Sequence, residues 1–328
     1  MRAYVVSELD GQLHCGLADV EPVATDPADV LVQVDYSGIN YKDALVAAAP
    51  SRVRRVATLV GGVDAAGVVV ASSDPGLASG TRVVVHGSDL GVGRDGGFAE
   101  FVYAPVRFIN VLPGELSTRN AMVIGTAGFT AMASVLALED HGLTGDGEVL
   151  VTGATGGVGS VAIALLSQRG YRPVASTGST NETAWLLERG ATRVIGRDDI
   201  SDRPERVLGS ERWAGAIDCI GGATLHQILR SLRYGGAVAA SGLVAGTDLA
   251  TTIYPFITRA VSLLGVDAVE ATRDTRERVW SALGEMAPLI DFAPLIDREV
   301  TLEELNDALD VVRRGATRGR ILVIPELR

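Results

Sequence analysis

A glycine-rich turn near the middle of the chain has the spacing of a phosphate-binding site. The turn Gly153–Gly159 contains four glycines and lies between the apolar run Val149–Thr152, which predicts a strand, and Ser160–Gln168, which predicts a helix. Small residues there let backbone N–H groups and a helix N-terminus approach a pyrophosphate. Such turns also occur as plain loops, but this strand-to-helix position is the context that a nucleotide site requires. The residues expected to hold the pyrophosphate are Thr155, Gly156, Gly157 and Val158.

The end of the following strand indicates which nucleotide is bound. An acid at this point would bind the ribose 2′-hydroxyl and repel a 2′-phosphate. The segment Ser176–Asn181 instead reads Ser-Thr-Gly-Ser-Thr-Asn, and the first acid is Glu182. Hydroxyl and backbone groups suit a phosphate, so Thr177, Gly178 and Ser179 favour NADPH over NADH.

The residue types that ligate metals do not form a metal-binding pattern. The chain has two cysteines, Cys15 and Cys219, and four histidines, and the cysteines lie far apart in the sequence. Zinc requires several convergent nitrogen or sulfur ligands, so we expect no metal. Two distant thiols form no disulfide framework and suit a reducing cytoplasm.

Composition narrows the class of protein further. A chain of 328 residues suggests two domains, and a hydrophobic content of 47% fits a large core. The formal charge of −11 argues against nucleic-acid binding. The N-terminus turns acidic too early for a signal peptide, and no apolar run is expected to reach the ~18 residues of a membrane helix. We therefore expect a soluble, cytoplasmic protein that binds no membrane.

The pattern of predicted strands and helices around the glycine turn differs between the first and the middle part of the chain. Residues 1 to about 120 contain short β-branched runs separated by Gly, Pro, Asp and Ser, which predicts a β-rich unit. The predicted strands are Ala3–Val6, Val30–Tyr36, Gly67–Val70 and Arg82–Val85.

From about residue 122 to 270, strand-like runs alternate with helical ones. Six apolar strands with crossover helices predict a doubly wound parallel sheet, covered on both faces. These strands are Glu148–Thr152, Pro173–Ser176, Arg193–Ile195, Gly215–Cys219, Ala237–Ser241 and Val261–Val266. Helical spacing is present in Thr183–Glu188 and Thr224–Leu232.

The last part of the chain is expected to return to the β-rich unit. Helices are predicted over Thr272–Met286 and Leu302–Arg314, and a final strand over Arg320–Ile324. The spacing of Leu302, Leu305, Leu309 and Val312 places these side chains on one stripe of the second helix.

Ten motifs, in the same order as in the family, give the chain a recognisable likeness. It resembles the medium-chain dehydrogenase/reductase superfamily, and within it the zinc-free, quinone-oxidoreductase-like branch typified by acryloyl-CoA reductase. The motifs lie at Ile39–Ala44, Gly62–Gly67, Gly96–Glu100, Ile124–Met132, Leu138–Asp140, Thr152–Ser160, Trp213–Asp218, Tyr254–Ile257, Gly265–Asp267 and Arg318–Arg320. Metal-using members carry Gly-His-Glu where this chain has Gly62-Val-Asp64, which agrees with the expectation of no zinc.

The resemblance implies a two-domain enzyme that uses NADPH. It implies a GroES-like catalytic domain over 1–121 and 271–328 and a Rossmann domain over 122–270. The family reduces an activated C=C bond beside a carbonyl: hydride adds to the β-carbon and a proton to the α-carbon, as in acryloyl-CoA to propionyl-CoA. Two alternatives stay open. The enzyme could instead reduce a free enone, a quinone or a biosynthetic intermediate, or the chain could be a non-catalytic nucleotide-binding protein. Family members also pair through the edge strand around Val261–Val266, which implies a homodimer.

The resemblance assigns the catalytic position to Tyr41 and its neighbour Asn40. The Tyr41 hydroxyl could orient the cofactor or donate to the thioester or enolate, and Asn40 could contact cofactor or substrate. The alternative is a tyrosine packed in a loop, and water could supply the proton instead. Asp43 is expected to cap the following helix. Asp64 lies in an apolar setting, so it must be paired and is expected to hold the active-site loop.

The resemblance also assigns further cofactor contacts. Thr130 would meet the nicotinamide carboxamide, and Thr126 could cap the same helix. Leu243 would lie beside the nicotinamide, and Arg320 could close the cofactor or phosphate cleft. Arg197 matches a phosphate contact of the family, with a surface ion pair to a neighbouring aspartate as the alternative.

Three departures from the family pattern concern phosphate and substrate binding. Ser179 stands where the family commonly has an arginine. The loops Ala47–Gly61 and Val85–Asp95, which border the substrate cleft in the family, differ in composition. The first loop carries three arginines that could hold CoA phosphates or could be solvated. They are Arg52, Arg54 and Arg55.

Overall fold

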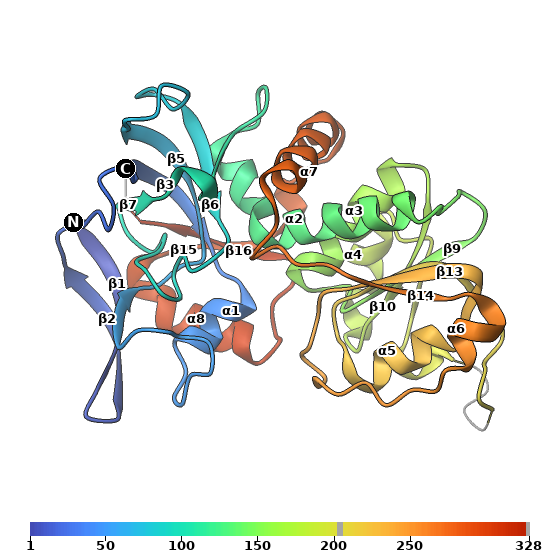
Figure 1. Ribbon diagram of the computed structural model, residues 1–328. Coiled ribbons are helices and arrows are strands. Elements are labelled where there is room, and N and C mark those ends of the chain that lie inside the picture. The colour runs from blue at the N-terminus through green and yellow to red at the C-terminus, as the bar shows by residue number, and fades with distance from the viewer. Residues whose placement is uncertain (202–205, 326–328) are drawn as a thin grey trace. The chain divides into compact units, whose positions relative to one another are not determined.

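The computed structural model describes residues 1–201 and 206–325. Within this part the chain forms two compact units (Figure 1). The first unit contains Met1–Ala127, Ala268–Ala287 and Asp291–Arg328, and the second contains Gly128–Asp267 and Pro288–Ile290. The chain therefore leaves the first unit for most of the second and returns to it, and it leaves again only for the three residues Pro288–Ile290. That the first unit is the catalytic domain and the second binds the cofactor stays a prediction.

Two β-sheets build the first unit. The smaller has the strand order β2-β1-β4, and the larger has the order β15-β16-β3-β5-β6-β8, with β7 also paired to β3. All of these neighbours are antiparallel except β15 and β16. The strands are Arg2–Leu9 (β1), Gln12–Asp19 (β2), Val30–Gly38 (β3), Thr58–Val60 (β4), Asp64–Ala71 (β5), Arg82–His86 (β6), Phe101–Ala104 (β7), Ile109–Val111 (β8), Ile296–Thr301 (β15) and Arg320–Ile324 (β16).

Alternating valines place the larger sheet on its core. Val30, Val32 and Val34 of β3 are buried in one cluster with Val83 and Val85 of β6. Successive side chains of a strand point to opposite faces, so this spacing of two puts every second residue inside. The β-rich character of the first unit is confirmed.

Five strands of this unit were not predicted: β2, β4, β7, β8 and β15. Most are short, and β2 has an exposed, irregular pattern rather than an apolar run. The sequence did contain a signal for β2, the pair Asp10-Gly11. Both residues have positive φ in the turn between β1 and β2. An Asp-Gly pair is typical of such hairpins.

Three helices belong to the first unit, α1 (Tyr41–Val46), α7 (Arg273–Met286) and α8 (Leu305–Arg313). The predicted apolar stripe is confirmed. Leu302, Leu305 and Leu309 are buried in one cluster, and Val312 packs against it. A 3₁₀ turn over Leu302–Glu304 precedes α8, so the predicted helix begins in a tighter form.

The second unit contains a six-stranded parallel sheet in the order β11-β10-β9-β12-β13-β14. Its strands are Glu148–Thr152 (β9), Arg172–Ser176 (β10), Arg193–Ile195 (β11), Trp213–Asp218 (β12), Leu232–Ala240 (β13) and Ser262–Gly265 (β14). All six lie where they were predicted, and the doubly wound class is confirmed. The order reverses direction between β9 and β12, the place where ligands bind in such sheets.

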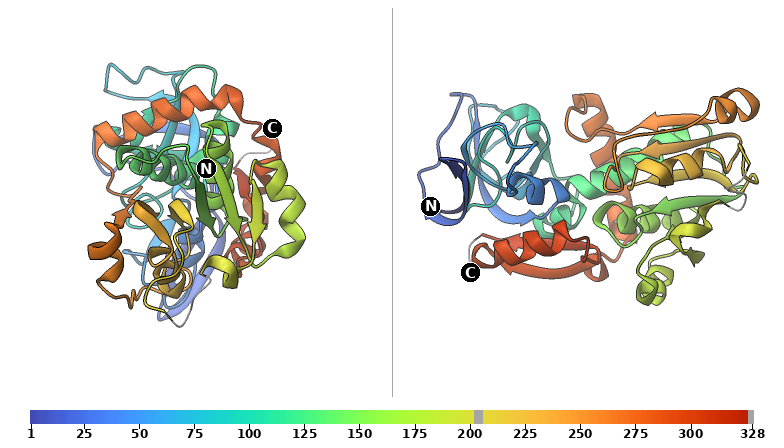
Figure 2. Two further views of the ribbon diagram at one scale, coloured as in Figure 1. Left: turned by 90° about the vertical axis from the view of Figure 1, so that its right-hand side faces the viewer. Right: turned by 90° about the horizontal axis from the view of Figure 1, so that it is seen from below.

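Helices lie on both sides of this sheet (Figure 2). They are α3 (Gly157–Gln168), α4 (Thr183–Glu188), α5 (Gly222–Leu229) and α6 (Tyr254–Arg259). The predicted helix Thr224–Leu232 was placed too late. Its end is wrong because Leu232 already pairs with Trp213 as the first residue of β13.

Helix α2 (Thr118–Asp140) corrects the expectation that no apolar run reaches membrane length. It is long and apolar enough to cross a bilayer, but 83% of its most apolar window is buried. A buried window is typical of the core helix of a soluble protein. The helix is also broken at Gly125, whose φ of 48° and ψ of −158° are not helical.

Candidate functional site

In the second unit, the predicted cofactor residues gather at one edge of the sheet. Thr155–Val158 follows β9, Thr177–Ser179 follows β10, Arg197 follows β11 and Leu243 follows β13. Because all six strands are parallel, their carboxyl ends share this edge. Thr130 belongs to the same unit and is 7% exposed on α2.

The turn after β9 has the tight geometry that the glycines imply. Gly153 has a φ of 58°, and a Cβ on Gly159 would lie 2.4 Å from the Gly153 oxygen. Helix α3 begins at Gly157 and is 12 residues long, so its first N–H groups face the turn. A helix N-terminus of this kind favours an anionic phosphate.

Arg197 packs directly against the loop after β10. A Cβ on Gly178 would lie 2.7 Å from the Nε, Cζ and Nη2 atoms of Arg197. The Thr177 hydroxyl accepts a hydrogen bond from the Ser179 N–H at 3.0 Å. The guanidinium therefore lies against the Gly178 backbone, in the segment between Thr177 and Ser179.

Asp218 organises the edge where β9 and β12 meet. Its carboxylate accepts from the Thr152 hydroxyl at 2.7 Å, from the Ile220 N–H at 3.2 Å and from the Gly221 N–H at 2.8 Å. Burial raises the pKa of Asp218, and these hydrogen bonds oppose that shift. Beyond it, a Cβ on Gly242 would lie 1.9 Å from the Cys219 carbonyl carbon, so glycine is required there. The following Leu243 is 54% exposed.

In the first unit, Asp64 is the centre of a buried polar network. Its carboxylate accepts from the Asn40 amide at 2.7 Å, from the Thr126 N–H at 2.9 Å and from the Thr126 hydroxyl at 2.5 Å. The Arg320 guanidinium lies 3.5 Å away. Asp64 is paired and holds the loop before α1, as expected, and it also caps the part of α2 that follows Gly125.

Arg320 completes this network from the last strand. Its side chain is 3% exposed, and its Nη1 donates to the Ile39 oxygen at 3.1 Å and to the Asn40 side-chain oxygen at 3.0 Å. A Cβ on Gly125 would lie 2.5 Å from Asp64 and 2.9 Å from Arg320. The structure therefore gives Arg320 protein partners that the sequence did not reveal, and direct closure of a cofactor cleft stays a prediction.

Asp43 lies beside this network at the start of α1. It accepts from the Asn40 N–H and from the Val63 N–H, both at 2.8 Å. The first bond caps α1, as expected for this aspartate. Burial, with the Asp64 charge as a smaller contribution, raises the pKa of Asp43 to about 7, against the effect of these hydrogen bonds and of Arg320.

Tyr41 is the first residue of α1 and follows the fixed Asn40 directly. Its side chain is 37% exposed. Within the described part of the chain its hydroxyl has no hydrogen-bond partner. That hydroxyl is therefore available to a ligand, which is evidence against a tyrosine tied down in a loop.

A small cavity of about 40 Å³ adjoins the network. Five segments form it: the start of α1, the residue before β5, the turn after β6, the part of α2 after Gly125, and the residues before α7. Its lining consists of Asn40, Lys42, Val63, Gly87, Ser88, Leu90, Thr126, Ala268 and Val269.

Helix α7 fixes the turn after β6. Arg276 donates to the His86 oxygen at 2.7 Å, and the Trp280 indole N–H donates to Nε2 of His86 at 3.0 Å. His86 must therefore be neutral at Nε2, and burial together with the Arg276 charge lowers its pKa well below the usual value. The Ser88 N–H then donates to the Val269 oxygen at 2.8 Å. The only sign of this anchor in the sequence is a tryptophan in an amphipathic helix.

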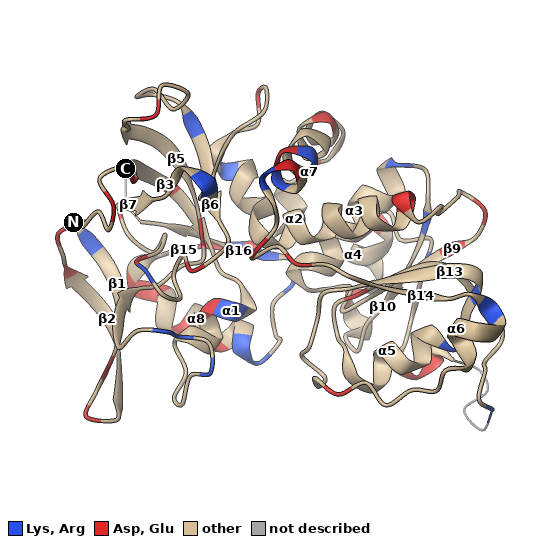
Figure 3. Cartoon of the chain, viewed as in Figure 1, with Lys and Arg blue, Asp and Glu red and all other residues tan. Residues whose placement is uncertain are grey.

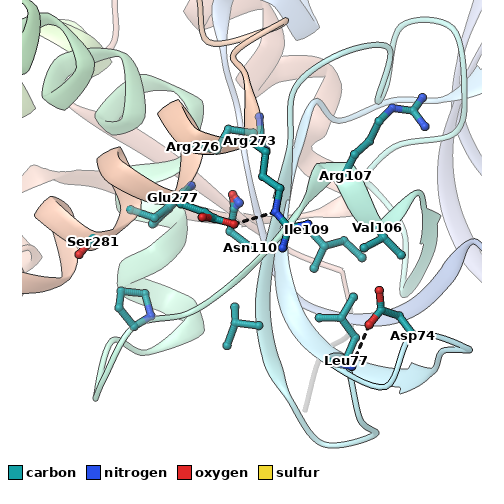
Figure 4. A pocket seen from close by; sticks show the side chains of 14 residues that line it. Asp74, Leu77, Val106, Arg107, Ile109, Asn110, Arg273, Arg276, Glu277 and Ser281 are labelled. Atoms are coloured by element: carbon teal, nitrogen blue, oxygen red, sulfur yellow. Dashed lines mark hydrogen bonds and ion pairs between the residues drawn. The ribbon is translucent and has the colours of Figure 1, made fainter.

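A larger cavity of about 620 Å³ lies elsewhere in the first unit (Figure 4). Leu77, Val106 and Ile109 contribute apolar surface. Three of its charged side chains already have protein partners, because Arg273 pairs with Glu277 at 2.7 Å and Arg276 binds main-chain oxygens. None of the predicted site residues lines it.

The three arginines of the loop before β4 do not act together. Arg54 is nearly buried, forms an ion pair with Glu8 and donates to the Val46 oxygen at 2.8 Å. It therefore has a structural role, and only Arg52 and Arg55 stay exposed for an anion. Elsewhere, Lys and Arg lie scattered among Asp and Glu (Figure 3).

The described residues contain no group of three or more His, Cys, Asp or Glu side chains that could hold a metal ion. Both cysteines, Cys15 and Cys219, are free.

Two family models match the chain. The alcohol dehydrogenase GroES-like domain matches residues 26–114, and the zinc-binding dehydrogenase domain matches residues 157–285. The second description names zinc, although the described residues contain no group of ligands for it.

Among curated proteins, YhfP of Bacillus subtilis, named "Putative quinone oxidoreductase YhfP", is 45% identical over 96% of this chain and 95% of its own. The acrylyl-CoA reductase AcuI of Ruegeria pomeroyi is 42% identical over 96% of each chain.

Solved structures agree in fold. The yhdH oxidoreductase of Salmonella enterica, in complex with NADP, superposes with a TM-score of 0.94 at 40% identity, over 99% of this chain and 100% of that one. The Bacillus subtilis YhfP structure, with NAD bound, gives 0.92 at 42% identity over 99% of each chain.

Proposed function

Because the chain belongs to the zinc-free, quinone-oxidoreductase-like branch of the medium-chain dehydrogenase/reductase family, we propose that it reduces the activated C=C bond of a short enoyl-CoA with NADPH. The observation that carries the proposal is the arrangement around Asp64: a buried ion pair fixes Asn40 from both sides, and the hydroxyl of the next residue, Tyr41, is available to a ligand. The relative AcuI, named as an acrylyl-CoA reductase, supports the same substrate class.

The cofactor residues of the second unit support NADPH. Bound NADPH supplies the hydride for the β-carbon. The first turn of α3 would hold the pyrophosphate, and Arg197 with Thr177 and Ser179 would hold the 2′-phosphate, because a guanidinium binds phosphate oxygens well. Thr130 and Leu243 would contact the nicotinamide. The yhdH oxidoreductase with NADP supports this choice, whereas YhfP was solved with NAD.

The residues around Asp64 suit the charge that develops during reduction. Addition of hydride to the β-carbon moves charge onto the thioester oxygen, which then needs a donor. The Tyr41 hydroxyl would donate to that oxygen. Asn40 cannot turn freely, because its amide nitrogen donates to Asp64 and its oxygen accepts from Arg320. It would therefore position Tyr41. The proton for the α-carbon comes from Tyr41 or from water.

The first test follows NADPH absorbance with acryloyl-CoA, crotonyl-CoA and a simple free enone, each repeated with NADH. Fast oxidation of NADPH with the CoA thioesters supports the proposal. If free enones turn over as well as thioesters, the second candidate, an enone or quinone reductase, is correct; the likeness to YhfP favours it. Tight NADPH binding without any turnover would indicate a non-catalytic nucleotide-binding protein.

A homodimer in a soluble, cytoplasmic setting is part of the proposal. Strand β14 is the last strand of its sheet, and an unpaired edge can join a second copy. Exposed apolar side chains lie on and near it, at Ile253, Tyr254, Ile257 and Leu263. Light scattering of the intact protein tests this, and a strictly monomeric mass contradicts it.

A further inference from the structure

The small cavity of the first unit has two kinds of wall. Polar side chains come from Asn40, Lys42, Ser88 and Thr126, and apolar ones from Val63, Leu90, Ala268 and Val269. An enoyl thioester has the same two parts, one carbonyl and one hydrocarbon end. Building on the proposed function, we infer that this cavity receives the acyl end of the substrate and that Leu90 and Val269 limit that end to three or four carbons.

The size of the cavity sets the limit. A water molecule needs ~10–15 Å³ of such space, so about 40 Å³ holds only a few heavy atoms. On this scale we expect the vinyl group of an acryloyl thioester, or the propenyl group of a crotonyl thioester, to fit. A six-carbon chain extends beyond this space unless a wall residue moves.

The wall residues are held too firmly to move. Leu90 is 1% exposed and belongs to the core cluster of the larger sheet. The neighbouring Gly91 is packed so closely that a Cβ would lie 2.6 Å from the Gly62 carbonyl. Close packing of this kind resists local displacement.

The opposite wall is tied to the same turn. The Ser88 N–H donates to the Val269 oxygen at 2.8 Å, and a Cβ on Gly87 would lie 2.8 Å from Arg276 and 3.1 Å from the Val269 oxygen. Since Arg276 also binds the His86 oxygen, helix α7 holds both sides of the cavity at a fixed separation. A rigid pocket discriminates by length because it cannot expand around a longer chain.

The test compares enoyl-CoA substrates of increasing length. We expect the wild type to use acryloyl-CoA and crotonyl-CoA at least ~100-fold better, in kcat/KM, than 2-hexenoyl-CoA, since each excluded methylene costs roughly 10- to 200-fold. In Leu90→Ala and Val269→Ala, the ratio of hexenoyl to acryloyl kcat/KM should rise about tenfold or more. The ratio within one variant is independent of how much of the protein is folded.

A matched control separates pocket size from core damage. Leu77 is buried in the same cluster as Leu90 but does not line the cavity, so Leu77→Ala should leave the length ratio unchanged. The opposite change, Ala268→Val, should reduce use of crotonyl-CoA more than use of acryloyl-CoA. It also keeps the test possible if Leu90→Ala does not fold.

The outcomes separate this inference from the proposed function. If the wild type oxidises NADPH with no enoyl-CoA of any length, the proposed function is wrong. If it reduces acryloyl-CoA and hexenoyl-CoA equally well, or if the variants at Leu90 and Val269 keep the wild-type ratio, the enzyme assignment stands. The assignment of the acyl group to this cavity is then overturned.

Discussion

Arg320 and Asp64 form a buried ion pair, with 3.5 Å between Nη2 and Oδ2 and with side chains 3% and 0% exposed. The two residues are far apart in the sequence, yet together they fix Asn40 from both sides, one through its oxygen and one through its nitrogen. The same carboxylate caps helix α2 after Gly125. The pair therefore determines the position of the segment that carries Tyr41.

Removal of both partners should destabilise the protein less than the sum of the two single removals. Arg320→Met or Asp64→Asn should each lower the free energy of unfolding by about 3–5 kcal/mol, because the other group is left buried without its partner. The double variant should lose less than the sum of the two, by an interaction energy of roughly 0.5–3 kcal/mol. Chemical denaturation of all four proteins measures this. Simple additivity would mean that the two groups are not coupled.

Tyr41→Phe should strongly reduce turnover while changing NADPH affinity only modestly. The variant removes the hydroxyl and leaves the ring, and loss of one donor to a developing oxyanion typically costs ~10²–10³-fold in kcat. Steady-state kinetics with acryloyl-CoA, combined with a fluorescence titration of NADPH, separates the two effects. Tyr234→Phe is the control, since that side chain is 72% exposed in the second unit. Unchanged turnover in the Tyr41 variant would remove this hydroxyl from the mechanism.

Gly178→Ala should weaken NADPH binding and spare NADH. The added Cβ would lie 2.7 Å from the Arg197 guanidinium, which must then move away from the loop at Gly178. We expect a rise in the KM for NADPH of about tenfold, the effect of losing roughly 1.4 kcal/mol, a modest share of a charged hydrogen bond. Gly145→Ala is the control, because no atom lies within 4 Å of its Cβ. Equal loss for both nucleotides would mean that Arg197 does not bind the 2′-phosphate.

Stability should fall in acid because of His86. Its pKa is lowered in the folded protein, mainly by burial, whereas an unfolded histidine titrates near ~6.5. Below that value the unfolded state binds the additional proton, so the contribution of His86 is constant above about pH 6.5. It is lost as the pH falls further, by up to ~1.4 kcal/mol per pH unit.

Comparison with a variant isolates this contribution. The raised pKa of Asp43 gives a slope of opposite sign, because the folded state keeps the Asp43 proton up to about pH 7. Asp43 is present in both wild type and His86→Gln, so its contribution cancels in the difference between their free energies of unfolding. Gln is chosen because its amide oxygen can still accept from Trp280. The wild type should lose stability relative to the variant below pH 6.5. His141→Gln, at an exposed histidine, should show no such difference.

Local sequence was sufficient for the parallel sheet and for its phosphate-binding turn. Each of the six strands contains an apolar run, and the tight turn at Gly153 and Gly159 is formed by residues close together in the sequence. The likeness to a family likewise depended on short motifs read in order. Strands such as β2 and β7 were missed because they are exposed or very short. Hydrogen bonds to the neighbouring strands β1 and β3 stabilise them, and composition does not reveal this pairing.

Only the tertiary structure revealed the partners of Asp64 and Arg320 and the narrow cavity beside Leu90. The sequence required a partner for a carboxylate among apolar neighbours, but it did not say that an arginine of the last strand provides it. Similarly, nothing in the order of residues places Val269 against Ser88, or His86 against Trp280. Contacts of this kind depend on how distant segments pack, whereas residue types and spacing determine which local element each segment forms.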